Sequence, residues 1–565
     1  MSKPTLNGNM IYLGHFPERA PTSHPSYLSY RHVNPVTHSI QKHLPCEDVN
    51  DIIHGYRRSD FSTEALVEDY HRGDVPKISI KKDEHYLRAL EECTRRFKPK
   101  NKCRPAHLNS VTRYPWKWQV SAEAPFSANP RMKEYIDKKF NKGLIPDHRL
   151  TFSNLKDEIF EFAKTRLHRI KAGAKKDKFG EDLRYWNHAH ARSHLVKATD
   201  PDKIRMVFGV PKMTVIAECM MLWQYINTLL TPEGPMLWGY ETLKGGWYGL
   251  YNWIYSSDSK PRTFLAFDWK QFDKRVQFEQ IDDAHKILRS FLDFENGYVP
   301  TKLHPTSNVT PERLENLWNW TCNAVKTTPE VLPTGDCYQR SHAGLPSGAF
   351  QTQLLDSIVN MIMLLTVMSR MGLDIQKAKI KVQGDDSIIG LLENIHPMAH
   401  EAFKQTFADY ANEYFGSILN TKKSEMSNTL NRLPVLGFTN ISGYPYREQN
   451  QLLASLLYPE RKSDENKLMA RCIGIAYANC GNHHNVFKIC EEIYNYLKSK
   501  GFSPNAAGLP DMFRLGITSL QIGIKPTEPL VFPSFYDTIK YLMQVPQFSE
   551  DVKRRHWPPD LFEIE

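Results

Sequence analysis

The sequence Lys379-Ile-Lys-Val-Gln-Gly-Asp-Asp-Ser-Ile-Ile-Gly390 predicts two short strands joined by a tight turn. Ile380 and Val382 alternate along the first strand, and an apolar pair follows in the second. The turn Gly384-Asp385-Asp386 between them is typical of a hairpin, because Gly and Asp adopt turn conformations readily. Two adjacent carboxylates therefore lie at its tip. In an isolated Gly-Asp-Asp sequence this pattern would indicate an ordinary solvated hairpin.

A second pair of carboxylates lies upstream, in Thr263-Phe-Leu-Ala-Phe-Asp-Trp-Lys-Gln-Phe-Asp273. An apolar, strand-like run ends there at Asp268, and Asp273 follows. If this strand lies beside the hairpin, carboxylates from distant parts of the chain meet. Mg²⁺ prefers such oxygen ligands and takes its remaining ligands from substrate phosphates, so the pattern indicates two-metal phosphoryl transfer.

Composition indicates a globular protein without a disulfide framework. The chain has 565 residues, is 41% hydrophobic, and carries 73 Lys and Arg against 63 Asp and Glu. This basic excess suits a polyanionic partner without requiring one. The nine cysteines include no CxxC pair, and no secretory signal is recognisable at the start. Polar residues interrupt the apolar run Leu354–Leu373, which favours a buried helix over a membrane span.

Two further segments suit an anionic ligand. Lys203 and Arg205 flank or lie in a strand-like Ile-Arg-Met-Val-Phe segment, where they could reach a triphosphate, although a basic edge strand is an equal explanation. Ser347 and Gly348 lie in a Gly- and Pro-rich loop before a helix predicted from Thr352. A helix N-terminus offers free N–H groups to an anion. A simple N-cap by Ser347 explains the segment equally well.

Taken in order, these segments resemble the motifs of viral RNA-directed RNA polymerases, most closely those of partitivirus-like double-stranded RNA viruses. The resemblance covers roughly residues 192–447. It is carried by the cations at 203–205, DxxxxD at 268–273, SGxxxT at 347–352 and GDD at 384–386, with a lysine-bearing loop at 419–424 and a primer-gripping hairpin at 436–447.

The resemblance implies a role for each matching residue. Asp268 and Asp385 are the expected principal ligands of two Mg²⁺ ions, with Mn²⁺ as a substitute, and Asp386 is expected to be an auxiliary ligand or a hydrogen-bond acceptor. Asp273 is expected to accept a hydrogen bond from the ribose 2′-OH. The expected nucleotide-binding residues are Lys203, Arg205, Asp273, Ser347, Gly348, Thr352 and Asn360. Lys423 is the expected general acid for pyrophosphate, with its neighbour Lys422 as an alternative.

One residue departs from the family pattern. Many members carry Asn nine residues after the motif's Ser, whereas this chain has Asp356 there and Asn360 one helical turn later. A second carboxylate near Asp273 would raise the pKa of one of the two acids or require a bridging cation. The sequence therefore leaves two alternatives, Asp356 or Asn360, for the residue that completes ribose recognition.

The resemblance implies an α+β right-hand fold of fingers, palm and thumb. An antiparallel palm sheet backed by helices and a mainly helical thumb are expected. The predicted divisions are an extended N-terminal arm at 1–50 that bridges fingers and thumb, fingers at 51–215, palm at 216–290, a fingers excursion at 291–343, palm again at 344–447, and thumb at 448–565.

The expected activity is RNA-directed RNA polymerisation from NTPs, for replication and transcription of a viral genome. Template and product RNA and NTPs are the expected partners, together with a viral capsid protein, in the virion interior or the host cytoplasm. A reverse transcriptase shares the palm, but such enzymes usually carry an aromatic residue before the paired aspartates, where this chain has Gln383-Gly384. A basic RNA-packaging protein would leave the order of the motifs unexplained.

Overall fold

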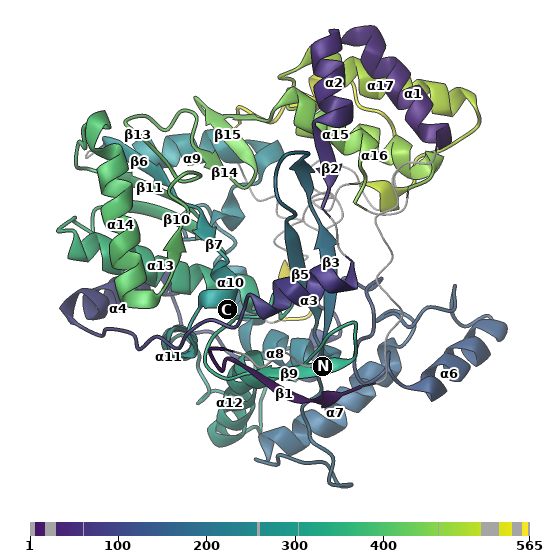
Figure 1. The fold of residues 1–565 in the computed structure, drawn as a ribbon. Coiled ribbons are helices and arrows are strands. Elements are labelled where there is room, and N and C mark those ends of the chain that lie inside the picture. The colour runs from purple at the N-terminus through teal and green to yellow at the C-terminus, as the bar shows by residue number, and fades with distance from the viewer. Residues whose placement is uncertain are drawn as a thin grey trace.

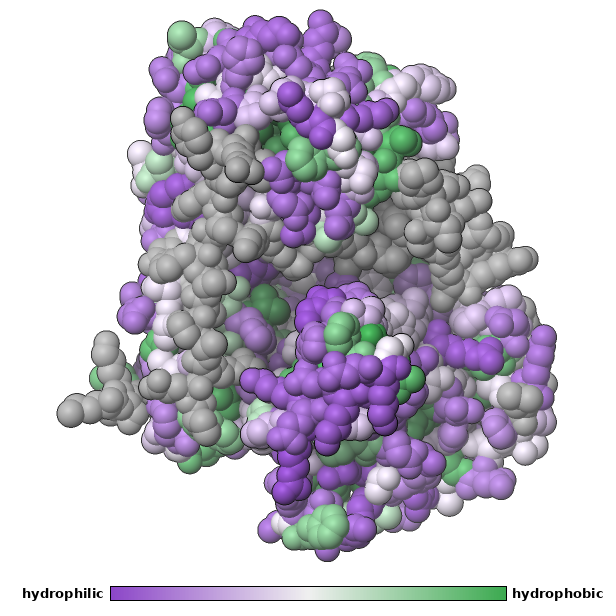
Figure 2. Space-filling view, turned by 90° about the vertical axis from the view of Figure 1, so that its right-hand side faces the viewer, coloured by the Kyte–Doolittle hydropathy of each residue, from purple (hydrophilic) through white to green (hydrophobic). Residues whose placement is uncertain are grey.

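The computed structural model describes residues 6–16, 30–59, 62–256, 260–302, 304–460, 463–509, 530–544 and 556–562. Three groups of elements surround the centre of the molecule: a four-stranded sheet with its helices, a five-stranded sheet with its helices, and a separate helical group (Figure 1). The space-filling view shows a hollow between the upper and lower parts of the chain (Figure 2).

The four-stranded sheet contains the predicted hairpin. Its order is β10-β11-β6-β13, and all neighbouring strands are antiparallel. The strands are β6 (Thr263–Ala266), β10 (Lys379–Gln383), β11 (Asp386–Leu391) and β13 (Glu425–Ser427). Gln383 pairs with Asp386, so Gly384 and Asp385 form a two-residue turn in which Gly384 has φ 64°. The prediction of two strands and a tight turn is confirmed.

Helix α13 forms the core behind this sheet. It packs against β10 and against neighbouring helices of the same group. The group consists of α13 (Thr352–Arg370) and its neighbours α4 (Glu84–Phe97), α11 (Phe278–Ser290) and α14 (His400–Phe415). By length and composition α13 could cross a membrane, but 89% of its apolar window is buried inside the protein. The prediction of a buried helix from Thr352 is confirmed.

The five-stranded sheet has the order β1-β9-β8-β3-β5, with one parallel pair, β3 and β8. Its strands are β1 (Met10–His15), β3 (Asn187–Ser193), β5 (Ile204–Gly209), β8 (Glu330–Val331) and β9 (Asp336–Arg340). The surrounding helices are α3 (Thr63–His71), α5 (Leu108–Val111), α6 (Pro130–Asn141), α7 (Lys156–Lys171), α8 (Lys212–Thr228) and α12 (Pro311–Thr327). The predicted cation strand is therefore β5, at the edge of this sheet.

The helical group combines the two ends of the chain (Figure 1). It contains α1 (Tyr30–His43), α2 (Cys46–His54), α15 (Gln449–Leu457), α16 (Glu465–Ala478) and α17 (His484–Ser499). The helices α15, α16 and α17 agree with the mainly helical structure expected after residue 448. Extended structure throughout 1–50 is wrong, because α1 and α2 are helices and the proposed boundary at residue 50 falls inside α2. Buried Val36 and Ile40, four residues apart, give α1 the apolar face that packs there.

The remaining described strands and α-helices are mostly short. They are β2 (Tyr56–Arg58) paired with β4 (Leu195–Lys197), β7 (Trp269–Lys270) paired with β12 (Ile418–Leu419), the sheet β14 (Pro434–Val435), β15 (Phe438–Ile441) and β16 (Tyr444–Tyr446), and the helices α9 (Gly246–Tyr255), α10 (Phe272–Arg275) and α19 (Phe535–Ile539). Because β7 and α10 directly follow β6, residues 268–273 leave the four-stranded sheet at one end.

Candidate active site

Three carboxylates meet at one end of the four-stranded sheet. Along the β11–β6 pair, Leu391, Gly390 and Ile389 face Thr263, Phe264 and Leu265. The same antiparallel register, continued toward the hairpin, brings Asp386 opposite Asp268. Asp385 precedes Asp386 in the turn. The two strands therefore bring Asp268, Asp385 and Asp386 to the same end of the sheet.

The charges of these carboxylates act on one another. The pKa of Asp386 is raised to about 7, first by burial and then by the neighbouring Asp385 and Asp268, while Arg205 and Lys203 act in the opposite sense. The pKa of Asp385 is also raised, first by burial and then by Asp273 and Asp268, against the lowering effect of Arg205. The exposed cations before and within β5 thus face the acidic end of the sheet.

The hairpin is held from behind by two polar side chains of α13. Asn360 is fully buried, and its Nδ2 donates to the carbonyls of Gly384 and Asp385, both at 3.0 Å. Its Oδ1 accepts from Trp269 Nε1 at 3.0 Å. The Gly384 N–H donates to Ser357 Oγ at 2.7 Å.

These contacts correct the expectation for Asn360. Both ends of its amide are used within the protein, so it supports the turn instead of facing a nucleotide. Ser357 was not predicted as a site residue, although it lies three residues before Asn360 and so on the same face of the helix.

Asp268 is held by the loop that carries the candidate general acids. Asn420 Nδ2 donates to Asp268 Oδ2 at 2.8 Å, and the Asp268 N–H donates to Ser424 Oγ at 3.1 Å. Lys422 and Lys423 lie between these two contacts and are both exposed. The loop therefore lies beside the carboxylates, but its contacts do not distinguish one lysine from the other. Asn420 and Ser424 were not predicted as site residues.

The Ser347-Gly348 loop packs directly on β5. The Phe208 N–H donates to the Ser347 carbonyl at 2.8 Å. Gly348 has φ 148°, and a Cβ at this position would overlap the Phe208 carbonyl oxygen, so the close approach requires glycine. Thr352 Oγ1 donates to the Pro346 carbonyl at 2.8 Å and closes the loop.

The same loop also holds the segment that contains Asp273. The Leu345 N–H donates to the Asp273 carbonyl at 2.7 Å, and the Gly344 N–H donates to the Val276 carbonyl at 2.8 Å. The cation strand, the Ser-Gly loop and Asp273 are therefore one connected unit, although they lie far apart in the sequence.

Asp356 points into this acidic region from α13. Its Oδ1 is buried and accepts no hydrogen bond from the described residues. Burial raises the pKa of Asp356 well above its ordinary value, and Asp273 and Asp385 raise it further, while Arg205 lowers it. Asp356 is thus an α13 residue whose charge interacts with that of Asp273.

The donor set fits a hard divalent cation. The three carboxylates at the sheet end offer only oxygen ligands, and the raised pKa values of Asp385 and Asp386 reflect burial and repulsion that a bound cation relieves. Within the described ranges, no three His, Cys, Asp or Glu side chains stand at metal-binding separation. The residues therefore suit Mg²⁺ or Mn²⁺ in their chemistry, but their oxygens would have to move closer together to share an ion.

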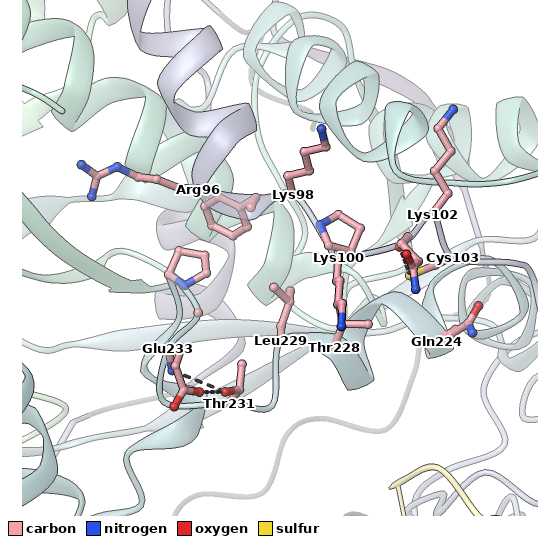
Figure 3. Close-up of a pocket in the computed structure, with 15 residues that line it drawn as sticks. Arg96, Lys98, Lys100, Lys102, Cys103, Gln224, Thr228, Leu229, Thr231 and Glu233 are labelled. Carbon is pink, nitrogen blue, oxygen red and sulfur yellow. Dashed lines mark hydrogen bonds between the residues drawn. The ribbon is translucent and has the colours of Figure 1, made fainter. Parts of the chain in front are cut away.

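A separate pocket of about 440 Å³ lies between the end of α4 and the end of α8. Figure 3 shows Lys100 pointing toward Thr228, while Lys98 and Lys102 extend in the other direction. None of the predicted site residues lines this pocket. Arg95 and Arg96, near the end of α4, are both paired with Glu92 of the same helix.

The fold and the site together define a right-hand nucleic-acid polymerase. Its parts are the antiparallel sheet with its acidic end, the five-stranded sheet with the cations before and within β5, and the helical group. A family model described as viral RNA-dependent RNA polymerase matches residues 152–499. This chain therefore belongs to the viral RNA-dependent RNA polymerases and is an RNA-directed RNA polymerase, which confirms the resemblance drawn from its motifs.

Individual relatives agree with this assignment. The chain is 36% identical over 573 residues to the RNA-directed RNA polymerase of White clover cryptic virus 1 (isolate Boccardo/2004), covering 93% of this chain and 91% of that protein. It is 25% identical over 495 residues to the RNA-directed RNA polymerase of Atkinsonella hypoxylon virus (isolate 2H), covering 81% and 71%. The solved Sicinivirus 3Dpol RNA dependent RNA polymerase shares the fold, with a TM-score of 0.61 at 14% identity over 88% of this chain and 96% of that one.

Proposed function

We propose that this polymerase copies a viral RNA template from NTPs by two-metal nucleotidyl transfer. The observation that carries the proposal is the β11–β6 register, which, continued toward the hairpin, brings Asp386 opposite Asp268, and the charges of Asp385 and Asp268 act on Asp386. These three residues would hold the two ions. When bound, the ions supply charge neutralisation at the triphosphate and lower the pKa of the primer 3′-hydroxyl.

The cations of the site have separate roles in this proposal. Lys203 and Arg205 hold the triphosphate from the side of the five-stranded sheet, Arg through its planar fork and Lys as a point charge. Both side chains are exposed. Lys423 or Lys422 donates a proton to the leaving pyrophosphate, because their loop is attached to Asp268.

Ribose recognition is assigned to Asp273, with Asp356 as its neighbour. Asp273 accepts a hydrogen bond from the 2′-OH, which a deoxyribonucleotide lacks. Asp356 has an unpartnered buried oxygen close enough for its charge to interact with that of Asp273. Ser347, Gly348 and Thr352 keep this region in shape through the loop they form on β5.

The biological setting is proposed from the family resemblance alone. We expect the enzyme to replicate and transcribe a double-stranded RNA genome, in the virion interior or the host cytoplasm, with a capsid protein as a further partner. The acidic site and the cations around it require only RNA, NTPs and divalent cations for the reaction itself.

The proposal is tested with purified protein, single-stranded RNA, four NTPs and either Mg²⁺, Mn²⁺ or EDTA. Incorporation is expected with each metal and lost in EDTA. Asp385→Asn is expected to abolish incorporation while retaining RNA binding, because it removes a charged metal ligand. Asp374→Asn is the matched control, since Asp374 is an acid paired with Lys377 outside the site. Substantial polymerisation by Asp385→Asn would remove Asp385 from the metal site.

A further inference from the structure

Arg340 is a buried arginine at the end of β9 that no motif predicts. It is 5% exposed, and its Nε donates to Glu330 Oε2 at 3.0 Å. The Tyr70 hydroxyl donates to the same oxygen at 2.8 Å. Glu330 is itself 2% exposed, and the Phe208 ring lies 5.5 Å from the guanidinium. Burying an ion pair is costly unless further hydrogen bonds satisfy it, and the Tyr70 hydroxyl supplies one here.

The other edge of the Arg340 guanidinium lies against the loop that holds Asp273. A Cβ on residue 344 would overlap Arg340 Nη1, so the arginine fills the space that Gly344 leaves empty. The adjoining N–H groups of Gly344 and Leu345 donate to the Val276 and Asp273 carbonyls. Arg340 therefore packs against the loop whose two backbone hydrogen bonds fix the position of the Asp273 backbone.

Arg340 also acts on Asp273 through its charge. Burial lowers the pKa of Arg340, but Glu330, Tyr70 and Asp273 raise it above its ordinary value overall. Between Arg340 and Asp273, both described residues, there is no ion pair within 4.0 Å. The charge of Arg340 thus acts on the Asp273 carboxylate without a direct ion pair between them. The carboxylate oxygens of Asp273 therefore remain available to a ribose hydroxyl.

We propose that Arg340 is a positioning residue for ribose selection: anchored by Glu330, it holds the loop and the charge of Asp273 in the arrangement that accepts the 2′-OH. This inference rests on the proposed function. An arginine is required because its planar fork contacts Glu330 on one edge and the Gly344 turn on another, whereas lysine offers a single point charge.

The test compares ATP and 2′-dATP incorporation on a primed RNA template, with kcat and KM measured separately for each nucleotide. Arg340→Met is expected to lower the ATP to dATP ratio of kcat/KM by about tenfold, mainly through poorer use of ATP. Asp273→Ala is expected to lower the ratio to a similar extent. The double variant is expected to lose little more, because both changes remove one shared arrangement.

Arg96→Met is the matched control, since Arg96 is a largely buried arginine paired with Glu92 at 2.7 Å on α4. Thermal unfolding is measured for every variant, and Arg96→Met is expected to lose stability with an unchanged ratio. Arg340→Lys is included in case the Met variant does not fold; it is expected to show a smaller loss of the ratio.

The proposal is overturned if folded Arg340→Met or Arg340→Lys keeps the wild-type ratio, or if the Arg340→Met and Asp273→Ala effects are additive. Its failure is distinguishable from failure of the proposed function. Absence of metal-dependent incorporation by the wild-type protein would reject the polymerase mechanism itself. Discrimination that depends on Asp273 but not on Arg340 would reject this inference alone.

Discussion

At the scale of single residues, Lys422 and Lys423 lie on one exposed loop between two contacts to Asp268. We expect Lys423→Leu to slow single-turnover incorporation about 100-fold while the NTP dissociation constant changes little, because a general acid acts in the transition state. Rapid-quench kinetics over a range of NTP concentrations separates the two quantities. Lys422→Leu is the matched control; if it carries the rate loss instead, the role moves to Lys422. A pure binding defect in both variants would remove the general-acid assignment from this loop.

At the scale of elements, Glu218 attaches α8 to the start of α13. It is fully buried; its Oε2 accepts the Phe350 N–H at 2.7 Å, and its Oε1 accepts Gln351 Nε2 at 2.9 Å. Burial raises its pKa from 4.5 to about 7, with the hydrogen bonds opposing part of the shift. Because the folded pKa of this acid is raised, its contribution to stability is present below about pH 4.5 and is lost as pH rises through about 7.

Glu218→Gln removes this titration. Relative to wild type, the free energy of unfolding of the variant is expected to rise by up to about 3 kcal/mol between pH 4.5 and pH 8. Urea unfolding at several pH values measures the difference, and any constant loss from a misplaced amide hydrogen bond cancels in the comparison. Wild-type and variant curves that run parallel across this range would contradict the raised pKa.

At the scale of the whole molecule, what the sequence could predict depended on local pattern. The hairpin follows from Gly384 and alternating apolar residues, and α13 follows from its apolar length. The supports of the site could not be read locally. Asn360 donates to a turn more than twenty residues away, and Arg340 reaches its partners only when β8, β9 and α3 assemble. The helix α1 was not predicted because its apolar face has few residues. His residues and Pro35 interrupt the helical pattern in its sequence.

The N-terminal segment connects two of the three groups. In the five-stranded sheet β1 pairs with β9, while Ile40 of α1 and Ile52 of α2 are fully buried in one apolar cluster with α15, α16 and α17. Asn9, just before β1, donates to the Ala343 carbonyl and accepts from the Ala343 N–H near the Ser-Gly loop. A single segment thus contacts both the helical group and the loop that holds Asp273.

This connection predicts that loosening the helical group lowers processivity and leaves the rate of single-nucleotide incorporation unchanged. Ile40→Ala with Ile52→Ala creates cavities that cost about 2–5 kcal/mol each, which loosens the helical group without touching the carboxylates. Primer extension on a long template with a heparin trap is expected to give shorter products, while single-nucleotide incorporation stays near the wild-type rate. Ile136→Ala is the matched control, because Ile136 is equally buried but lies in α6, away from this cluster. If the control shortens the products equally, the effect is general destabilisation. If only the double variant shortens them, the helical group formed by both ends of the chain contributes to holding the RNA during elongation.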